Sequence, residues 1–215
     1  MPVTDSAAIA ITHSGLVEYQ EALAIQRQIH SEVASGLRSN TMLLLEHPSV
    51  YTAGKRTLPH ERPVGDTPVF DVDRGGKITW HGPGQLVGYP IVKLKNPHEL
   101  VGFVREIEAG LIAVCGAMGV NGVRVAGRSG VWIVDSSGER KIAAIGIRVA
   151  SGTSMHGFAL NVSPDLAAFD SIVPCGISDA AVTSLARELA RDVDIDEVLP
   201  LVEVHMGTAL AKVSA

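Results

Sequence analysis

The sequence is poor in aromatic residues and has only two cysteines. Aromatic side chains make up 4% of the 215 residues, so aliphatic side chains must supply most of any hydrophobic core. Two cysteines, Cys115 and Cys175, are too few for a disulfide framework, and we expect both to be reduced thiols. Because 46% of the residues are hydrophobic, a chain of this length can bury a sufficient core, and we predict one domain over residues 1–215.

The sequence also lacks the signatures of membrane-spanning, secreted and nucleic-acid-binding proteins. No uncharged apolar run approaches the roughly 20 residues that a helix needs to cross a bilayer. The first residues show no basic segment followed by a continuous apolar core, as a secretory signal requires. The net charge is −5 and the basic residues are scattered, which disfavours nucleic acid as a partner. We therefore predict a cytoplasmic location, with no membrane and no nucleic-acid partner.

Nucleotide and metal motifs are missing as well. No GxxxxGK[ST] segment occurs, and the HGPGQ turn at residues 81–85 is followed by strand-like sequence instead of the helix that a dinucleotide loop opens. There is no CxxC or HExxH motif, and His47, His81 and His156 do not have the spacing of a metal site. We predict neither a metal nor a cofactor, and the roles of the three histidines stay open.

The pattern of hydrophobic residues predicts helices at both ends of the chain and strands in the middle. Helical spacing covers residues 16–37, 96–119, 179–191 and 195–213, with Cys115 beside the apolar stripe of the second helix. Strand-like segments cover residues 8–12, 41–54, 77–80, 86–94, 122–127, 130–135, 141–150 and 155–162, and residues 60–76 are mostly loop. This arrangement is typical of an α+β fold, and we expect the helices on one side of the sheet.

Two reactive side chains lie in specialised, glycine-rich segments. Lys141 opens the sequence KIAAIG, and Cys175 stands between Pro174 and Gly176. A free thiol has a pKa of about 8.5 and is mostly protonated at neutral pH, so a nucleophilic cysteine needs a base or a positive neighbour. A histidine or Lys141 would serve. Arg74 precedes two glycines and is either a surface charge or a clamp for a ligand oxygen.

Several segments together resemble one enzyme family. LLLEHPSVYTAG (43–54), RGGKITWHGPGQLVGYPI (74–91), GVWI (130–133), KIAAIGIRV (141–149), HGFALNV (156–162) and DSIVPCGISDAAVTSL (170–185) occur in the order found in the lipoyl(octanoyl) transferases. The resemblance implies a mixed central sheet with flanking helices, like the catalytic domain of the biotin and lipoate protein ligases. It implies transfer of an octanoyl group from acyl carrier protein to a lysine of lipoyl domains. The expected acceptors are 2-oxoacid dehydrogenases and the glycine-cleavage H protein.

The resemblance also implies roles for single residues. Cys175 would be the acyl-thioester nucleophile, and Lys141 would lower the pKa of its thiol. The expected acyl-substrate site consists of Arg74, Gly75, Gly76, Lys77, Ile78, Thr79, Trp80, His81, Ala144, Ile145, Gly146, Gly157, Phe158 and Ala159. Because the partners are acidic, we expect a basic docking face, with Lys55, Arg56, Arg62, Arg140 and Arg148 as candidates. The alternatives are an ATP-dependent lipoate ligase on the same fold and a binding module without catalysis.

Overall fold

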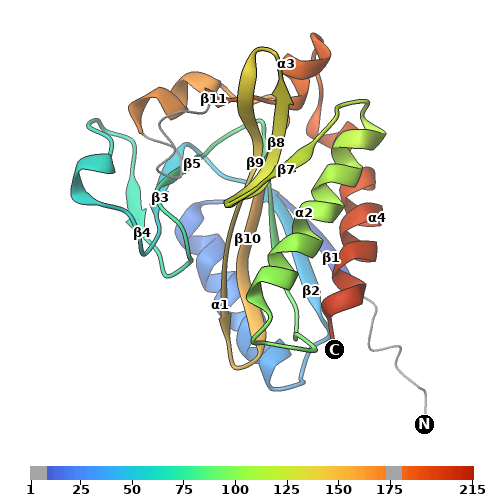
Figure 1. The fold of residues 1–215 in the computed structure, drawn as a ribbon. Helices are drawn as coiled ribbons and strands as arrows, with labels where there is room; N and C mark the ends of the chain where they lie inside the picture. Colours follow the sequence, from blue (N-terminus) through green and yellow to red (C-terminus); the bar gives the residue numbers. More distant parts are fainter. Residues whose placement is uncertain (1–8, 173–180) are drawn as a thin grey trace.

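The computed structural model of the protein describes residues 9–172 and 181–215. Its main feature is an eight-stranded mixed sheet with helices on both faces (Figure 1). Across the sheet the strands run β1 (Ala10–Leu16), β2 (Thr41–Glu46), β6 (Gln85–Ile91), β10 (Thr153–Asn161), β9 (Gly138–Ala150), β8 (Arg128–Asp135) and β7 (Val123–Val125). The short strand β11 (Ala181–Val182) pairs with β9. β1–β2 and β9–β11 are parallel pairs and the other pairs are antiparallel.

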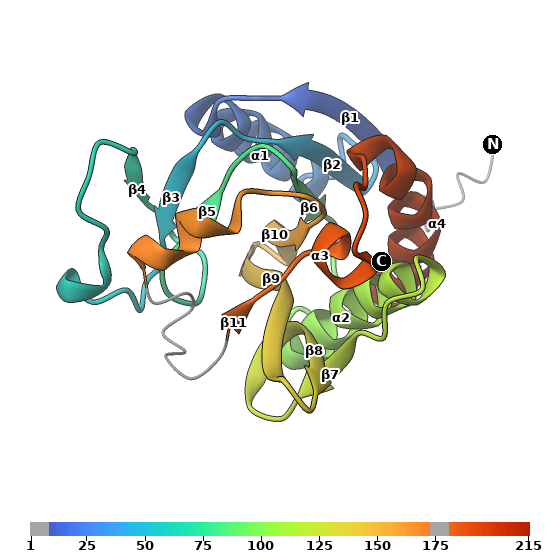
Figure 2. The same cartoon turned by 90° about the horizontal axis from the view of Figure 1, so that it is seen from above.

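A smaller three-stranded sheet stands beside the main one. Its order is β4 (Val69–Asp71), β3 (Val50–Ala53) and β5 (Thr79–His81). Seen from above, these strands lie at the end of the molecule opposite α2 and α4 (Figure 2). Two short 3-10 helices, Pro59–Glu61 and Leu166–Ser171, complete this region, and Phe169 of the second packs with Trp80 of β5.

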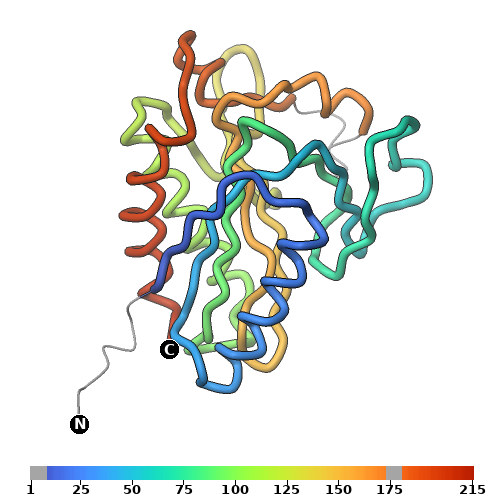
Figure 3. The backbone as a smooth tube through the Cα atoms, turned by 180° about the vertical axis from the view of Figure 1, so that it is seen from behind, coloured from blue at the N-terminus to red at the C-terminus, as the bar shows by residue number. Residues whose placement is uncertain are grey.

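The helices cover both faces of the main sheet, so the expectation of helices on one side is wrong. α1 (Tyr19–Ala34) packs against one face, and α2 (Leu100–Ala117) and α4 (Ile195–Val213) pack together on the other (Figure 3). The cause is visible in β2, which is apolar at four consecutive positions and therefore on both faces. Leu43 and Leu45 belong to the core under α1, whereas Met42 and Leu44 belong to the core under α2 and α4. A strand that is apolar on both sides must be covered on both sides.

The sequence of residues 41–54 predicts a buried strand that Pro48 halts, and the structure has two strands there, in different sheets. β2 ends at Glu46 and β3 begins at Val50, with Pro48 between them. Proline has no N–H to donate to a strand ladder, so the pairing stops there and the chain crosses from the large sheet to the small one. The sequence thus indicated the stop at Pro48 but not the change of partner that follows it.

Two helix predictions also need correction. Residues 16–37 form a helix only over Tyr19–Ala34, because Leu16 belongs to β1 and Leu37 is 84% exposed after the helix end. The expected helix over residues 179–191 is reduced to α3 (Leu185–Leu189), since Ala181–Val182 pairs as a strand. Residues 179 and 180 lie outside the described part of the chain.

Other expectations are confirmed. α4 covers residues 195–213 as predicted, and α2 lies within the predicted 96–119. Cys115 is fully buried in the core between α2 and the sheet, and burial raises the pKa of its thiol to about 12. Within the described residues, no helix is long and apolar enough to cross a membrane.

Candidate functional site

A cavity of about 290 Å³ lies where β9, β10, the loop before β5 and the small sheet meet. Most of the expected acyl-site residues line it, namely Arg74, Gly76, Lys77, Thr79, His81, Ala144, Ile145, Gly146, Gly157, Phe158 and Ala159, together with Lys141. Gly75, Ile78 and Trp80 are not among its described lining residues. Ile78 and Trp80 are buried in the small core around Phe169, and the Gly75 N–H donates to the carbonyl of Ile147 at 3.0 Å. The segments singled out in the sequence thus converge on one cavity.

Glycine lets two backbones approach each other at this cavity. Gly157 faces Gly88 of the neighbouring strand, and a Cβ at position 157 would lie 2.1 Å from the Gly88 carbonyl oxygen. Gly146 faces the loop that carries Arg74, and a Cβ there would lie 2.8 Å from the Arg74 Cδ. Side chains at these positions would fill the space that the loop and the strands now share.

Arg74 is a buried clamp inside the protein, not a surface charge. Its residue is 8% exposed, and its Nη1 donates to the carbonyl oxygens of Gly75 and Lys77, both at 2.9 Å. Its Nη2 donates to the carbonyl oxygen and the Oγ1 of Thr52 at 2.7 and 2.9 Å. The guanidinium therefore ties the glycine loop to β3 and presents one side of itself to the cavity. Lys77, at the end of the loop, pairs with the Glu61 carboxylate.

A chain of hydrogen bonds fixes the tautomer of His81. The carbonyl oxygen of Thr183 can only accept, so Asn161 donates to it through Nδ2 at 2.9 Å. Asn161 Oδ1 then accepts from Gln85 Nε2 at 2.9 Å, and Gln85 Oε1 accepts from His81 Nδ1 at 2.8 Å. His81 Nε2 is thereby left as the acceptor, and the Thr52 hydroxyl donates to it at 3.3 Å. A neutral imidazole satisfies every partner in this chain.

The histidine and tyrosine side chains at and behind the cavity wall are uncharged at neutral pH. Burial, with a smaller contribution from the nearby His47, lowers the pKa of His81 to about 3. Burial also lowers the pKa of His47, whose Nδ1 donates to the Val17 carbonyl and whose Nε2 accepts from the Tyr89 hydroxyl, both at 2.7 Å. The pKa of Tyr89 is raised by burial, and that of Tyr19 is raised to about 12 for the same reason. Together with Ala144, Ile145 and Phe158, these neutral rings give part of the lining an uncharged surface suited to an apolar group. Arginine and lysine residues line the rest, namely Arg56, Arg74, Lys77, Arg128 and Lys141.

His156 is held in an unusual conformation at the cavity edge. Its φ is 57°, the left-handed region that residues other than glycine seldom occupy. Its N–H donates to Gln26 Oε1 at 3.1 Å, and its Nε2 contacts Asp73 Oδ1 at 2.7 Å. Burial lowers the pKa of His156 although Asp73 opposes the shift, so the neutral ring donates to the carboxylate. These contacts connect β10 to the residue before Arg74.

Lys141 is buried within β9 and is not an exposed strand-end charge. It is 7% exposed and lines the cavity. A β-bulge lies here, because Val131 pairs with Ala143 whereas the next residue, Trp132, pairs with Lys141. Bulges of this kind redirect a side chain. The Lys141 Nζ lies 4.6 Å from the centroid of the Trp132 ring, which is a cation–π contact.

A small recess adjoins Lys141. Its lining residues are Thr79, Gln85, Lys141, Ala144, Asn161, Phe169 and Val182. Phe169 precedes and Val182 follows the stretch of sequence that contains Cys175, and Val182 pairs directly with Lys141. Cys175 itself lies outside the described residues. The described chain on both sides of the predicted nucleophile therefore contacts the recess at Lys141.

Sequence reasoning missed several polar residues of the site. Gln85 and Tyr89 are four residues apart on β6, on the face that carries the cavity, in a strand that is otherwise apolar and buried. Tyr19, from the first turn of α1, also lines the cavity, and Asn161 bonds to Gln85 across the strands. Two polar side chains at an even spacing in a buried strand were the available signal.

The expected basic docking face is largely compensated by acidic partners. Arg62 pairs with Asp71, Arg140 with Asp135 and Glu188, and Arg148 with Asp73. Arg56 lines the cavity. In the part of the chain that the structure describes, no three His, Cys, Asp or Glu side chains come close enough to hold a metal ion.

Comparison with known proteins identifies the family. Residues 18–207 match the lipoyl protein ligase A/B catalytic domain. An octanoyltransferase from Salinispora tropica is 55% identical over 209 residues, which cover 96% of this chain and 98% of the relative. An octanoyltransferase from Acidothermus cellulolyticus is 60% identical over 199 residues, which cover 92% of this chain and 90% of the relative.

Solved structures share the fold at low identity. A crystal structure of lipoate-protein ligase A bound with ATP superimposes with a TM-score of 0.74 at 15% identity, over 94% of this chain and 85% of that one. The biotin protein ligase of Aquifex aeolicus in complex with biotin and ATP superimposes with a TM-score of 0.54 at 15% identity, over 94% and 71% of the two chains. These likenesses confirm the predicted mixed sheet with flanking helices. The sequence matches show more: the chain belongs to the octanoyltransferase family and carries the lipoyl protein ligase A/B catalytic domain.

Proposed function

We propose that the chain transfers an octanoyl or lipoyl group from acyl carrier protein to a lysine of lipoyl domains, through an acyl thioester on Cys175. Its family membership makes it an acyltransferase. One observation carries the mechanism. Lys141 is buried where it lines both the cavity and the recess that Phe169 and Val182 share, and these two residues flank the sequence that contains Cys175.

The first half of the proposed reaction loads the enzyme. Lys141 takes the thiol proton of Cys175, and the thiolate attacks the carbonyl carbon of the donor thioester. The bond between that carbon and the donor sulfur breaks, and the departing thiolate takes the proton back from the Lys141 ammonium. The Trp132 ring supports this step, because its face stabilises a positive charge on the Nζ between the two proton transfers. One thioester replaces another, so no cofactor and no ATP are needed.

The second half unloads the acyl group onto the acceptor. The acceptor lysine arrives as an ammonium, releases one proton to water, and attacks the acyl-Cys175 carbonyl as a neutral amine that gives its second proton to neutral Lys141. The carbon–sulfur bond breaks, an amide forms, and Lys141 returns its proton to the Cys175 thiolate. Amide formation from a thioester is favourable and drives the sequence forward. The proposed acceptors are the lipoyl domains of 2-oxoacid dehydrogenases and the glycine-cleavage H protein.

The cavity supports an acyl chain as the group carried. Its wall combines Ala144, Ile145, Phe158 and Ala159 with histidine and tyrosine side chains that stay uncharged at neutral pH. An alkyl chain gains about 0.8 kcal/mol for each methylene that it buries, so a cavity of limited depth selects a chain of limited length. Residues 1–215 are proposed to act as one catalytic domain, and the predicted cytoplasmic location stays a prediction.

The test is intact-mass measurement after incubation with octanoyl-acyl carrier protein and no acceptor. The wild type should gain one octanoyl group, and Cys175→Ala should gain none. Cys115→Ala is the matched control, because this second cysteine is buried in the core and should not change the adduct. Lys141→Ala should lose transfer activity. Full transfer by Cys175→Ser or by Lys141→Ala would refute the mechanism.

A parallel assay separates transfer from ligation. Octanoyl-acyl carrier protein without ATP should support modification of a lipoyl domain, and free octanoate with ATP should not. Turnover that requires ATP and free octanoate would establish the ligase alternative. A slow, ordinary alkylation rate of Cys175 by iodoacetamide near neutral pH would favour a binding module.

A further inference from the structure

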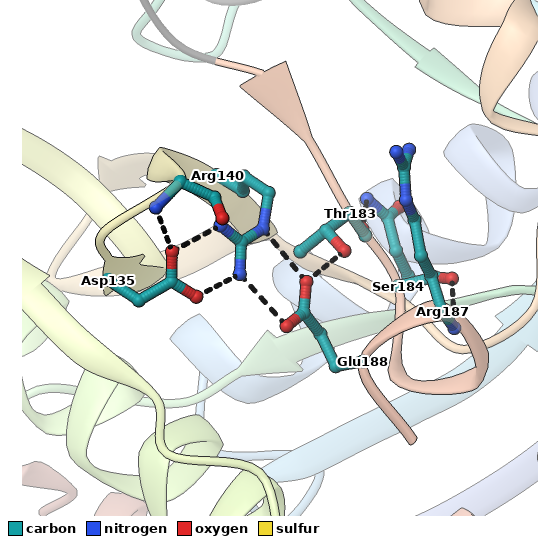
Figure 4. A network of polar contacts seen from close by, with 8 residues as sticks. Asp135, Arg140, Thr183, Ser184, Arg187 and Glu188 are labelled. Atoms are coloured by element: carbon teal, nitrogen blue, oxygen red, sulfur yellow. Dashed lines mark hydrogen bonds and ion pairs between the residues drawn. The ribbon is translucent and has the colours of Figure 1, made fainter. Parts of the chain in front are cut away.

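Arg140 stands at the centre of an ion-pair network next to Lys141 (Figure 4). Its Nε and Nη2 donate to the two carboxylate oxygens of Glu188, both at 3.0 Å. Its Nη1 and Nη2 donate to the two oxygens of Asp135 at 3.0 and 2.8 Å. The guanidinium is thus held by two carboxylates through paired bonds, the strongest geometry that an arginine adopts.

The Glu188 arm of this network is shielded from water, which distinguishes it from an ordinary surface pair. The side chains of Arg140 and Glu188 are 15% and 17% exposed, whereas that of Asp135 is 47% exposed. The hydrogen bonds from Arg140 lower the pKa of Glu188 and lower that of Asp135 to about 2, so both carboxylates are ionised at neutral pH. Exposed pairs are weak because water competes for both partners, and that competition is reduced at Glu188.

Thr183 connects this ion-pair network to the backbone of Lys141 in β9. The Thr183 hydroxyl donates to Glu188 Oε1 at 2.5 Å, and its N–H donates to the carbonyl oxygen of Lys141 at 2.9 Å. Its own carbonyl accepts from Asn161. Ser184, the next residue, accepts from the N–H of Arg187 and begins α3, the helix that carries Glu188 (Figure 4). Thr183 is therefore fixed on three sides.

The strand that this network holds needs such support. β11 consists of Ala181 and Val182, which pair with Arg140 and Lys141 of β9. A two-residue strand makes too few ladder bonds to stay in register by itself, since strands usually contain three to ten residues. β11 is also the first described part of the chain after the stretch that contains Cys175. Contacts that hold β11 beside Lys141 therefore hold the described residues at which the Cys175 segment ends.

We propose that Arg140 and Glu188 are positioning residues for acyl transfer. They lock β11 against β9, so that the chain bearing the nucleophile starts from a fixed place beside Lys141. The inference rests on the proposed function, in which Cys175 and Lys141 act together. It also assigns a role within the enzyme to Arg140, which the sequence placed on a docking face.

The test compares two carboxylates that pair with arginines. Glu188→Gln removes the charge that links Arg140 to β11. Glu197→Gln removes a charge of the same kind from the exposed Arg191–Glu197 pair between α3 and α4, which does not contact the cavity. Asp135→Asn removes the second partner of Arg140 but leaves its bonds to Glu188. We would measure kcat and KM for octanoyl transfer, the rate of Cys175 alkylation against pH, and Tm.

Glu188→Gln should lower kcat at least tenfold with KM for the donor within about twofold, because small displacements of reacting groups are costly in rate. It should also slow alkylation of Cys175 near neutral pH. Glu197→Gln should match the wild type, and Asp135→Asn should lie between the two. Thr183→Val, which removes only the hydroxyl bond to Glu188, should show a smaller loss of kcat in the same direction and serves if Glu188→Gln does not fold.

Distinct outcomes overturn distinct claims. If the wild type forms the acyl adduct on Cys175 but Glu188→Gln and Thr183→Val keep the kcat of Glu197→Gln, the positioning role is wrong and the proposed function stands. If the loss of kcat follows the loss of Tm across all variants, the network is structural only. If the wild type forms no adduct, the proposed function fails and this inference fails with it.

Discussion

Acidification should destabilise this fold through His81, a histidine that is kept neutral inside the cavity wall. Burial lowers its pKa to about 3 in the folded protein, whereas the unfolded chain has the ordinary value of about 6.5. Between these two values the unfolded chain binds a proton that the folded chain does not bind. The free energy of unfolding therefore falls as the pH drops below about 6.5. The stability that the folded protein has with neutral His81 is fully present only above that pH.

The size of the effect follows from the two pKa values. A pH of 5 is about 1.5 units below the pKa of the histidine in the unfolded chain, and each unit corresponds to about 1.36 kcal/mol. His81 alone should therefore lower the free energy of unfolding at pH 5 by about 2 kcal/mol. The folded His81 stays neutral at pH 5, because protonating it would break the bond from Thr52 to Nε2. The lowered pKa values of His47 and His156 act in the same direction.

Urea unfolding at pH 7 and pH 5 measures how much of the loss in unfolding free energy is due to His81. His81→Gln keeps a neutral side chain that donates and accepts, but it has no proton to gain in this range. Between the two pH values the wild type should lose about 2 kcal/mol more than His81→Gln, whatever the variant costs at pH 7. His98→Gln, at an exposed histidine, should lose as much as the wild type. Equal losses in the wild type and His81→Gln would refute the reasoning.

Three further predictions follow from single contacts. Glu108 is fully buried and accepts the N–H of Gly130 at 3.0 Å, so Glu108→Ala should cost roughly 3 kcal/mol of unfolding free energy in urea, against less than about 1 kcal/mol for Glu106→Ala on the same helix; equal costs would contradict this. Gly157→Ala would place its Cβ 2.1 Å from the Gly88 carbonyl oxygen and should cost about 3 kcal/mol in the same assay, whereas an unchanged free energy of unfolding would contradict the close approach of the two strands. Shortening the donor acyl chain below octanoyl should lower kcat/KM about fourfold per methylene, and a flat series would exclude burial of the chain in the cavity.

The parts of the fold that could be predicted are those whose partners lie close in sequence. α4 repeats apolar residues at helical spacing over its whole length, and the predicted bounds match the observed ones. The hairpins around residues 123–161 were visible because turn residues separate their strand-like segments. Periodicity reports which face of an element is buried, and in these cases that information was sufficient.

The errors arose where the partner of a segment lies far away. Pro48 marks a stop within residues 41–54, but nothing local shows that β2 joins one sheet and β3 another. The pair Ala181–Val182 looked helical with the residues after it, but β9 offers it a strand edge. Tertiary pairing overrode local preference at both places.

The residues of the candidate site were predicted from the family resemblance, whereas the hydrogen bonds among them could not be predicted. Arg74 was placed at the site, but its bonds to Thr52, which is 22 residues away, depend on how the glycine loop packs against β3. Gln85 and Asn161 are 76 residues apart and meet only because β6 and β10 are neighbours. A sequence shows the donors and acceptors, whereas the pairing among them is a property of the assembled sheet.

Thr183 joins the wall of the cavity to the support of β11. The hydrogen bonds that begin at Arg74 and hold His81 neutral end at the Thr183 carbonyl oxygen, while the Thr183 hydroxyl belongs to the Arg140–Glu188 network. The same residue bonds to the carbonyl of Lys141. A displacement of β11 would therefore disturb the acyl wall as well as the lysine, because one backbone unit serves both. The proposed reaction needs the alkyl chain and the Lys141 amine in a fixed relation. Because Thr183 bonds to both the cavity wall and β9, the two should keep their positions together or lose them together.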